Sequence, residues 1–552
     1  MPVILHVYAN SDDALLAWRP EPWQDDVVGF TVERKDLASG AVTTLNNRIP
    51  ADPGGTVPAG GVASSASPIR RCMWTDHEVE QGGKVAYRVI PMTESGDGFA
   101  PRDAEASTWV SPAAADAEDG ASVSFNRGTL MSQVVSRLVD GEVNVASLKA
   151  LKTKLAEPGY AGRRYLSGQA RHALLDFMAN ADRRGNHLYA ALYELNDPEL
   201  VEGLKAFGKR AHVLLGNGSS TGADTAHDLE AAKVEVKHRD LSKKGASSPS
   251  VHNKFAVEVD AASGKALRML TGSTNWTTTG LCTQLNNVLL LERPETANHF
   301  YQQWKKLSEV GDDMPAALRA SNGQRFDDDK IATYFAATKG QAEFKPVLDA
   351  IANAKQGALF LMFMPGESPL LQALLGRVTE KNAPYIRGVV STVNATATGA
   401  ITEHKSQVIA NGVPENRFHD EVLLPTGLPA KGKPGWSRDE FERNMYFAAG
   451  LNAIIHSKTI VIDPFSDDCV VITGSHNFSP AASEHNDENL VIIRGNRTLA
   501  QSYAVHIEGV YDHFAWRAFL SNGGKASELF QPVSDWKKGN RAHELAFWMN
   551  GA

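Results

Sequence analysis

Two short stretches of the chain repeat the same polar residues in the same order. SVHNKFAVEVD (250–260) and IIHSKTIVID (454–463) each place a histidine two residues before a lysine. A Gly-Ser-x-Asn sequence with an aromatic residue after it follows each stretch, its glycine 20 residues after the first histidine and 18 after the second. A single His-x-Lys arises often by chance, but two copies with the same partner indicate a duplicated site. Its polar residues are His252, Lys254, Ser273 and Asn275 in the first copy and His456, Lys458, Ser475 and Asn477 in the second.

These residue types suit the chemistry of a phosphodiester. Side chains two apart on a strand share one face, so each histidine lies beside its lysine. Two lysines and two asparagine amides can clamp the phosphoryl oxygens without a metal ion. One imidazole can attack phosphorus to give a phosphohistidine, and the other can protonate the leaving oxygen and then activate water. Because no Cys, His or carboxylate cluster has metal-ligand spacing, we expect neither a metal nor a cofactor.

The paired motifs resemble the signature of the phospholipase D superfamily, His-x-Lys-x4-Asp followed by Gly-Ser-x-Asn, over roughly residues 125–530. The second copy matches in full and includes Asp463. The first copy departs, because Val259 stands at the aspartate position, between Glu258 and Asp260. Seven residues is an odd offset on a strand, so the motif aspartate should point away from its histidine and act as a scaffold residue. Its loss should affect local geometry more than chemistry, unless a β-bulge brings Asp260 into place.

The resemblance also implies how the histidines are supported. In this superfamily a carboxylate beyond each Gly-Ser-x-Asn supports a catalytic imidazole, commonly that of the opposite lobe. Glu488 lies 14 residues after the second glycine, and the matching residue in the first copy is Asn286. If the support crosses between lobes, Glu488 holds His252 and the neutral Asn286 faces His456. The expectation is that His252 is the nucleophile and His456 the acid.

The first 112 residues are predicted to form an all-β sandwich, because short β-rich runs alternate there with Gly/Pro/Ser-rich turns. The order of these runs resembles a fibronectin type III domain, with another small β-sandwich as the alternative. A small, polar, acidic stretch at 113–124 is typical of a linker. The residues that carry the resemblance are Trp18, Asp76, Val79, Gly83, Tyr87 and Val89.

Beyond the linker, helix-like and strand-like segments alternate, which predicts α/β architecture. A helix-like run and a buried-strand run at 169–195 recur at 344–364. The expected fold is therefore a pseudo-twofold phospholipase D fold of two similar lobes, residues 125–310 and 330–530, with a C-terminal tail at 531–552. The proline that starts the following helix precedes the motif histidine by 54 residues in the first lobe and 87 in the second. About 33 extra residues are placed within 412–450, where aromatic side chains suit a substrate wall or core packing.

Composition limits the function classes. Of 552 residues 42% are hydrophobic, no run is long enough to span a membrane, and the N-terminus lacks the basic flank of a signal peptide. We therefore expect a cytoplasmic protein by default, with non-classical export left open. Three cysteines exclude a disulfide framework, and both half-sites in one chain predict a monomer.

The substrate class is left between two phosphodiesters. A net charge of −8 disfavours a broad nucleic-acid surface, although it permits a local basic groove. A phospholipid head group is therefore placed ahead of DNA or RNA. The aromatic residues after Gly-Ser-x-Asn, in contrast, resemble the nuclease branch of the superfamily. A catalytically degenerate member that only binds phosphate is the third hypothesis.

Overall fold

The computed structural model describes residues 3–550, apart from 53–57, 59, 78–83, 113–117, 129–134, 136–137, 140–141, 219–220, 222, 245–248, 379, 392–421, 424–447, 452–453 and 522–530. The predicted insertion at 412–450 and its aromatic residues lie almost wholly outside the described residues. Among the helices that are described, none is long and apolar enough to cross a membrane.

The N-terminal region consists of two antiparallel sheets and a short ribbon. Trp18 is fully buried between the sheets with its ring edge against Phe30, and the Tyr87 hydroxyl donates to Asp76 at 2.9 Å. The region is all-β as expected, and its fibronectin type III character stays a prediction. In sheet order, the strands are β1 (Ile4–Ala9), β2 (Ala14–Arg19) and β7 (Met73–Asp76); β4 (Val42–Thr44), β3 (Val27–Asp36), β8 (Val85–Ser95) and β9 (Gly98–Pro101); and β5 (Asn46–Asn47) with β6 (Val62–Ala63).

A seven-stranded mixed sheet forms the first lobe. Its central strand β14 starts at Lys254, and all six of its residues are buried, as a strand covered on both faces requires. β11, β12 and β13 run parallel to one another, and the remaining neighbours are antiparallel. In sheet order the strands are β10 (Ala121–Phe125), β16 (Asn287–Leu291), β15 (Ala266–Gly272), β14 (Lys254–Val259), β11 (His187–Leu192), β12 (Ala211–Leu215) and β13 (Glu235–His238).

An eight-stranded sheet forms the second lobe, and seven of its strands follow the order and directions of the first sheet. The additional strand is β17 at one edge. This correspondence supports the predicted pseudo-twofold relation between the lobes. In sheet order the strands are β17 (Phe326–Asp328), β18 (Ile331–Ala336), β24 (Glu488–Arg494), β23 (Val470–Gly474), β22 (Thr459–Ile462), β19 (Gly357–Met362), β20 (Tyr385–Val390) and β21 (Val422–Leu423).

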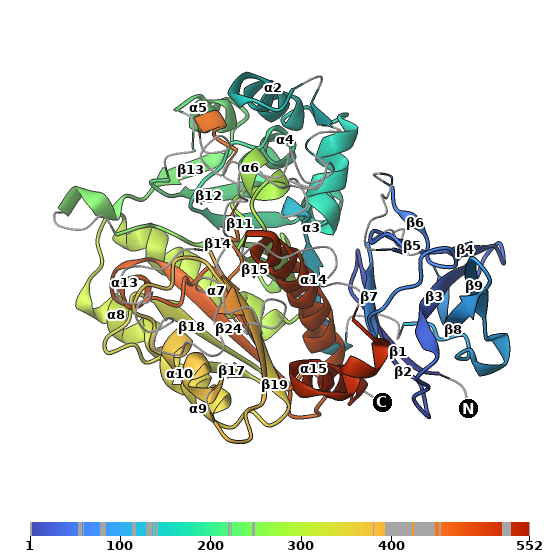
Figure 1. Cartoon of the computed structure of the whole chain (residues 1–552). Helices are drawn as coiled ribbons and strands as arrows, with labels where there is room; N and C mark the ends of the chain where they lie inside the picture. The colour runs from blue at the N-terminus through green and yellow to red at the C-terminus, as the bar shows by residue number, and fades with distance from the viewer. Residues whose placement is uncertain are drawn as a thin grey trace.

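Helices cover both faces of each sheet (Figure 1). α7 and α14 join the central hydrophobic core with one face of each sheet, and the opposite faces pack in two separate cores. Along β14, Phe255 and Val257 enter the central core and Ala256 an outer one, which is the period of two of a strand. The helices are α2 (Val145–Leu155), α3 (Ala161–Arg183), α4 (Pro198–Phe207), α5 (Ala223–Ala231), α6 (Thr278–Cys282), α7 (Pro294–Val310), α8 (Ala316–Asn322), α9 (Phe344–Ala352), α10 (Pro369–Val378), α13 (Pro480–His485), α14 (Arg497–Ser521) and α15 (Gly539–Met549).

Two predicted boundaries differ from the structure. Strand β10 begins at Ala121, inside the predicted linker, because it pairs with β16 at the edge of the first sheet. The predicted C-terminal tail contains α15, which packs against β2 and β20. There the Tyr8 hydroxyl donates to the Trp548 carbonyl at 2.6 Å, so α15 joins the N-terminal sandwich to the second lobe.

The motif aspartate of the second lobe is a scaffold residue, as its odd offset predicts. The buried Asp463 carboxylate accepts hydrogen bonds of 2.7–3.1 Å from the backbone N–H groups of residues 355–357, where β19 begins. In the first lobe Glu258 has the corresponding scaffold role. It accepts from Asn186, directly before β11, at 2.6 Å and from Arg268 at 2.6 Å.

Asp260 does not replace the missing aspartate. The strand register does shift between Glu258 and Val259, which is the irregularity of a β-bulge. The Asp260 carboxylate nevertheless bonds the backbone N–H and hydroxyl of Ser263 in its own turn.

Replacing Asp463 should therefore destabilise the fold. Asp463→Ala removes the acceptor of the N–H groups of residues 355–357, of which that of Gly357 is buried, so the free energy of unfolding should fall by about 3 kcal/mol. Urea titration measures this change. The matched control is Asp260→Ala, whose exposed carboxylate serves only its own turn. Equal unfolding midpoints for the two variants would contradict the scaffold role.

Candidate active site

The two lobes meet through two short backbone pairings. A parallel bridge joins Val251 to Asp487, and another joins Leu285 to Ile455. The next residue in each case is a motif histidine: the His252 N–H donates to the Asp487 carbonyl at 2.9 Å, and the His456 N–H donates to Leu285 at 3.0 Å. Each histidine therefore lies beside the residue that immediately follows its bridge partner in the other lobe.

The two imidazoles face each other with ring centroids 6.3 Å apart. His252 Nδ1 lies 3.2 Å from Oε1 of Glu488, a close contact without the alignment of a hydrogen bond. His456 Nδ1 lies 2.9 Å from Oδ1 of Asn286 and 3.0 Å from the Ser273 carbonyl oxygen. Both expected contacts between lobes are present. Because each Nδ1 faces acceptors, its proton sits there and Nε2 keeps the lone pair.

The lysines are buried beside their histidines under one aromatic ring each. Lys254 Nζ donates to the His252 carbonyl at 2.7 Å and lies 5.1 Å from the centre of the Tyr193 ring. Lys458 Nζ donates to the His456 carbonyl and lies 5.0 Å from the centre of the Phe363 ring. The same rings contact the imidazoles, Tyr193 at 4.9 Å from His252 and Phe363 at 4.8 Å from His456. Each ring thus contacts both the lysine and the imidazole of its own lobe.

Burial dominates the electrostatics of this cluster. It lowers the pKa of His252 to about 4, with a further lowering by Lys254 and an opposing effect of Glu488. The pKa of His456 falls well below 6.5 through burial and through the charges of Lys458 and Lys254. Burial also lowers the pKa of Lys254 to about 7 and holds that of Lys458 well below its usual value. Although burial acts against it, contact with His252 holds the pKa of Glu488 at about 2, so the carboxylate is charged.

The Gly-Ser-x-Asn turns position the remaining predicted residues. Gly272 and Gly474 both have φ of +137°, and a Cβ there would lie 2.3–2.4 Å from a backbone oxygen of the adjacent strand. The serines bond the start of that strand, Ser273 to Asn286 at 2.8 Å and Ser475 to the Asn489 N–H at 3.0 Å. Asn275 and Asn477 follow, both with a buried side-chain oxygen that lacks a hydrogen-bond partner. Five of the predicted residues thus contact a motif histidine directly: Lys254, Lys458, Ser273, Asn286 and Glu488.

The sequence analysis did not identify three residues that shape the site. Tyr193 and Phe363 directly follow the equivalent strands β11 and β19, so aligning the two predicted strand ends would have revealed them. Asn126 accepts from the Asn286 N–H and donates to carbonyls of α6, which fixes the turn that faces His456. Among the described residues, no group of three or more His, Cys, Asp or Glu side chains is placed to hold a metal ion.

The fold and site define a two-lobed α/β protein with one histidine–lysine pair from each lobe. Residues 431–511 match the family described as "Cardiolipin synthase, PLD-like domain". A mitochondrial cardiolipin hydrolase of Danio rerio is 35% identical over 107 residues, which are 19% of this chain and 40% of that protein. The chain thus spans well under half the length of this curated relative. These matches are similarities to the phospholipase D superfamily over part of the chain.

Two bacterial proteins are among the solved structures that resemble parts of the chain. Phosphatidylserine synthase of Haemophilus influenzae Rd KW20 is 10% identical, covers 68% of this chain and 93% of its own, and gives a TM-score of 0.40. Nuc of Salmonella typhimurium, titled a phospholipase D family member, is 20% identical, covers 33% of this chain and 95% of its own, and gives a TM-score of 0.22.

Burial of uncharged histidines predicts loss of stability in acid. The folded imidazole of His252 stays neutral down to pH about 4, whereas an unfolded histidine takes up a proton near 6.5. The stability that depends on the neutral form is therefore complete above 6.5 and falls as the pH drops toward 4. We expect His252 to contribute a loss of about 2 kcal/mol between pH 7 and 5.

Urea unfolding of wild type and His252→Asn at both pH values measures this contribution. Asparagine does not titrate, so the variant should lose less stability than wild type between pH 7 and 5. Equal pH dependence in the two proteins would show that His252 is not buried in its neutral form.

Proposed function

We propose that this protein is a metal-independent phosphodiesterase that hydrolyses, or transfers, a phosphodiester through a phosphohistidine intermediate. The observation that carries the proposal is the pair of opposed imidazoles, each oriented through Nδ1 by the other lobe. A neutral imidazole with Nε2 unprotonated is the form that attacks phosphorus. Lysine and asparagine donors from both lobes stabilise the phosphoryl oxygens as phosphorus becomes five-coordinate.

His252 is the proposed nucleophile because it alone of the two faces a carboxylate. Once its Nε2 bonds to phosphorus, the ring carries imidazolium-like charge, and Glu488, whose contact with Nδ1 is 3.2 Å, stabilises that charge. Asn286 offers His456 only a neutral acceptor. His456 is the proposed acid: it donates a proton from Nε2 to the leaving alcohol, and the same nitrogen then accepts a proton from the attacking water.

Binding of the substrate anion favours the protonated form of the proposed acid, His456. Lysine charge is among the causes that hold the pKa of His456 low, and a bound phosphodiester anion opposes that effect. His456 therefore gains its proton as the anion enters. The same anion favours charged Lys254 and Lys458.

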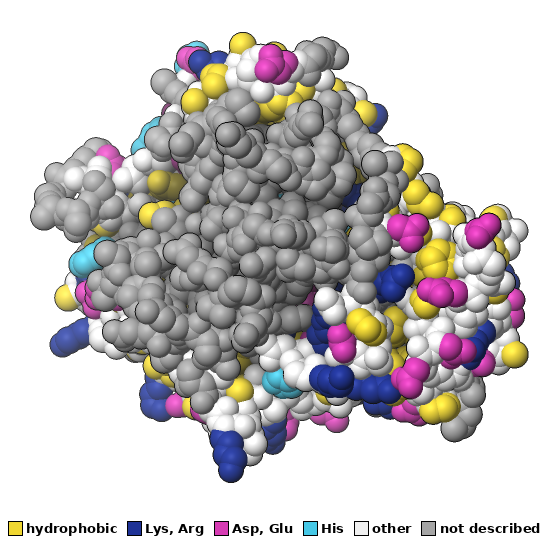
Figure 2. Space-filling view, in the orientation of Figure 1, with side chains coloured by type: hydrophobic (Ala, Val, Ile, Leu, Met, Phe, Trp, Pro, Cys, Tyr) yellow, Lys and Arg dark blue, Asp and Glu magenta, His cyan; other side chains and the backbone are white. Residues whose placement is uncertain are grey.

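For the substrate we propose a phospholipid head group ahead of DNA or RNA. The curated relative is named a cardiolipin hydrolase, and the matched family is named for cardiolipin synthase. Over the N-terminal sandwich, acidic and basic side chains intermingle (Figure 2), whereas a duplex-binding surface gathers basic ones. A nuclease of the same superfamily is the second candidate, and the Trp276 and Phe478 that follow the two asparagines favour it.

A parallel assay in excess EDTA tests both the reaction and the substrate. Purified protein is offered phosphatidylcholine, cardiolipin, single-stranded DNA and duplex DNA. We expect turnover of a phospholipid that chelation does not reduce, because lysine and asparagine supply the oxyanion stabilisation. Activity that disappears with EDTA and returns with a divalent ion would overturn the metal-free mechanism. Turnover of nucleic acid alone would select the nuclease.

Trapping the phosphoenzyme tests the roles of the two histidines. With bis(p-nitrophenyl) phosphate the leaving group needs no proton, so His456→Ala should form phospho-His252 and accumulate it, since no base activates water. His252→Ala should form none. Acid-labile phosphate on the His456 peptide of His252→Ala would reverse the roles.

Glu488 provides a second test of that assignment. Glu488→Gln should lower turnover at least about 100-fold, because the phosphohistidine loses its anionic partner. The matched variant Asn286→Ala removes only a neutral acceptor and should cost less. A larger loss in Asn286→Ala would contradict the assignment.

A further inference from the structure

Glu194 is a second carboxylate beside the paired site, and neither the motifs nor the mechanism assigns it a role. It follows Tyr193, whose ring contacts His252, and only 8% of its surface is exposed. Asn275 Nδ2 donates to its Oε2 at 2.9 Å, which leaves one amide hydrogen of Asn275 for a phosphoryl oxygen. Its charge also raises the pKa of Lys254, against the larger lowering by burial. Glu194 therefore acts on two groups that clamp the substrate.

At the equivalent position of the second lobe, which is among the described residues, no carboxylate stands. Phe363 corresponds to Tyr193, since each follows its strand and covers the lysine of its lobe. The next residue there is Met364, which is 53% exposed. Glu194 therefore gives the first lobe a negative charge that the symmetry of the fold does not require.

A glycine loop holds Glu194 in place. A Cβ at Gly218 would lie 2.1 Å from Cγ of Glu194, and one at Gly216 would lie 2.7 Å from the Val251 carbonyl oxygen. The Gly218 N–H donates to the Tyr193 carbonyl at 3.2 Å. The lack of side chains at Gly216 and Gly218 thus lets the backbone of this loop lie directly against Glu194.

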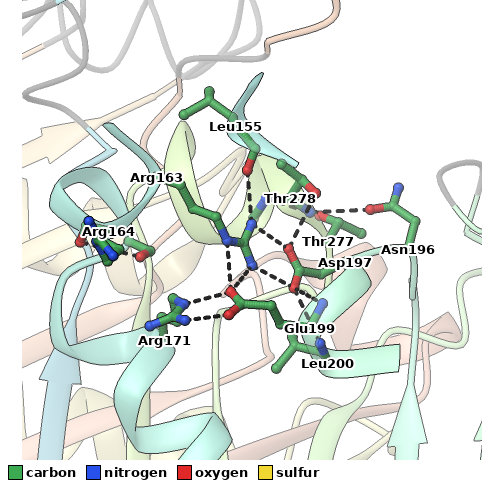
Figure 3. A network of polar contacts seen from close by, with 12 residues as sticks. Leu155, Arg163, Arg164, Arg171, Asn196, Asp197, Glu199, Leu200, Thr277 and Thr278 are labelled. Carbon is green, nitrogen blue, oxygen red and sulfur yellow. Dashed lines mark hydrogen bonds and ion pairs between the residues drawn. The ribbon is translucent and has the colours of Figure 1, made fainter. Parts of the chain in front are cut away.

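A buried ionic network joins the segments that follow Glu194 and Asn275 in the sequence (Figure 3). Arg163 and Asp197 are fully buried and share two hydrogen bonds of 2.8 Å. Asp197 also accepts from the Thr278 hydroxyl at 3.2 Å, while its own N–H donates to the Trp276 carbonyl at 3.2 Å. These bonds tie the segment after Glu194 to the segment after Asn275. The Glu194–Asn275 contact is therefore part of a rigid structure.

We propose that Glu194 is a specificity-determining residue that admits a phosphodiester monoanion and disfavours a phosphomonoester dianion, and this rests on the proposed function. A diester carries one negative charge, whereas a monoester carries close to two at neutral pH. Glu194 repels the second charge at low dielectric but leaves the diester two lysines and two amides. Because hydrolysis converts a diester to a monoester at this site, Glu194 speeds release of that product.

Calorimetric binding of inorganic phosphate at pH 8 tests the proposal without any turnover. Glu194→Gln keeps an acceptor for Asn275 but removes the charge, so phosphate should bind about 10-fold more tightly. The KM for bis(p-nitrophenyl) phosphate should change much less. Glu202→Gln, which removes a charge from an exposed side chain of the same lobe, should leave phosphate binding unchanged.

Glu194→Asp separates charge from orientation. It keeps the charge but shortens the reach to Asn275, so kcat should fall while phosphate affinity stays close to that of wild type. Equal tightening in Glu194→Asp and Glu194→Gln, or unchanged or undetectable phosphate binding in Glu194→Gln, would overturn the proposal. Absence of diester turnover in wild type would instead refute the proposed function, and the phosphate isotherms would still report on Glu194.

Discussion

The site depends on two backbone pairings between the lobes. Parallel bridges are directional, so pairing Val251 with Asp487 places His252 beside Glu488, and pairing Leu285 with Ile455 places His456 beside Asn286. Support between lobes is therefore a consequence of backbone register. The α7 and α14 helices, which enter one core with both sheets, keep the lobes close enough for the bridges to form.

The two bridges are not equally reinforced. Arg239 is fully buried, holds both carboxylate oxygens of Asp487 and bonds the carbonyl of Asp313 at 2.9 Å. At the other bridge the corresponding residue is Leu285, which is buried in the central core. An ion pair removed from water is stable only with further hydrogen bonds, and here those bonds fix the backbone beside Glu488. The side of the site that carries the proposed nucleophile thus has the stronger geometric constraint.

Much of the arrangement could be predicted from local patterns, because the motifs are short and their geometry follows from strand periodicity. Alternation along a strand predicted that Asp463 would point away from the imidazoles. The contact of Glu488 with His252 was implied by the resemblance to the phospholipase D superfamily and not by spacing alone. Glu258 was harder to predict, since its partner Asn186 is 72 residues away. The burial of α15 depends likewise on Tyr8 and on the second sheet, which are distant in sequence.

Desolvation links the rings over the lysines to the chemistry of the site. Tyr193 and Phe363 take the place of water beside the ammonium groups, so the charged forms of Lys254 and Lys458 lose hydration that only an anion restores. Charge in the site therefore depends on the ligand, and each added negative charge favours further protonation. Unopposed, this effect would hold a dianion more tightly than a monoanion. The fixed negative charge of Glu194 opposes the tighter binding of a dianion. This accounts for a carboxylate beside the lysine and asparagine side chains that bind the phosphoryl group.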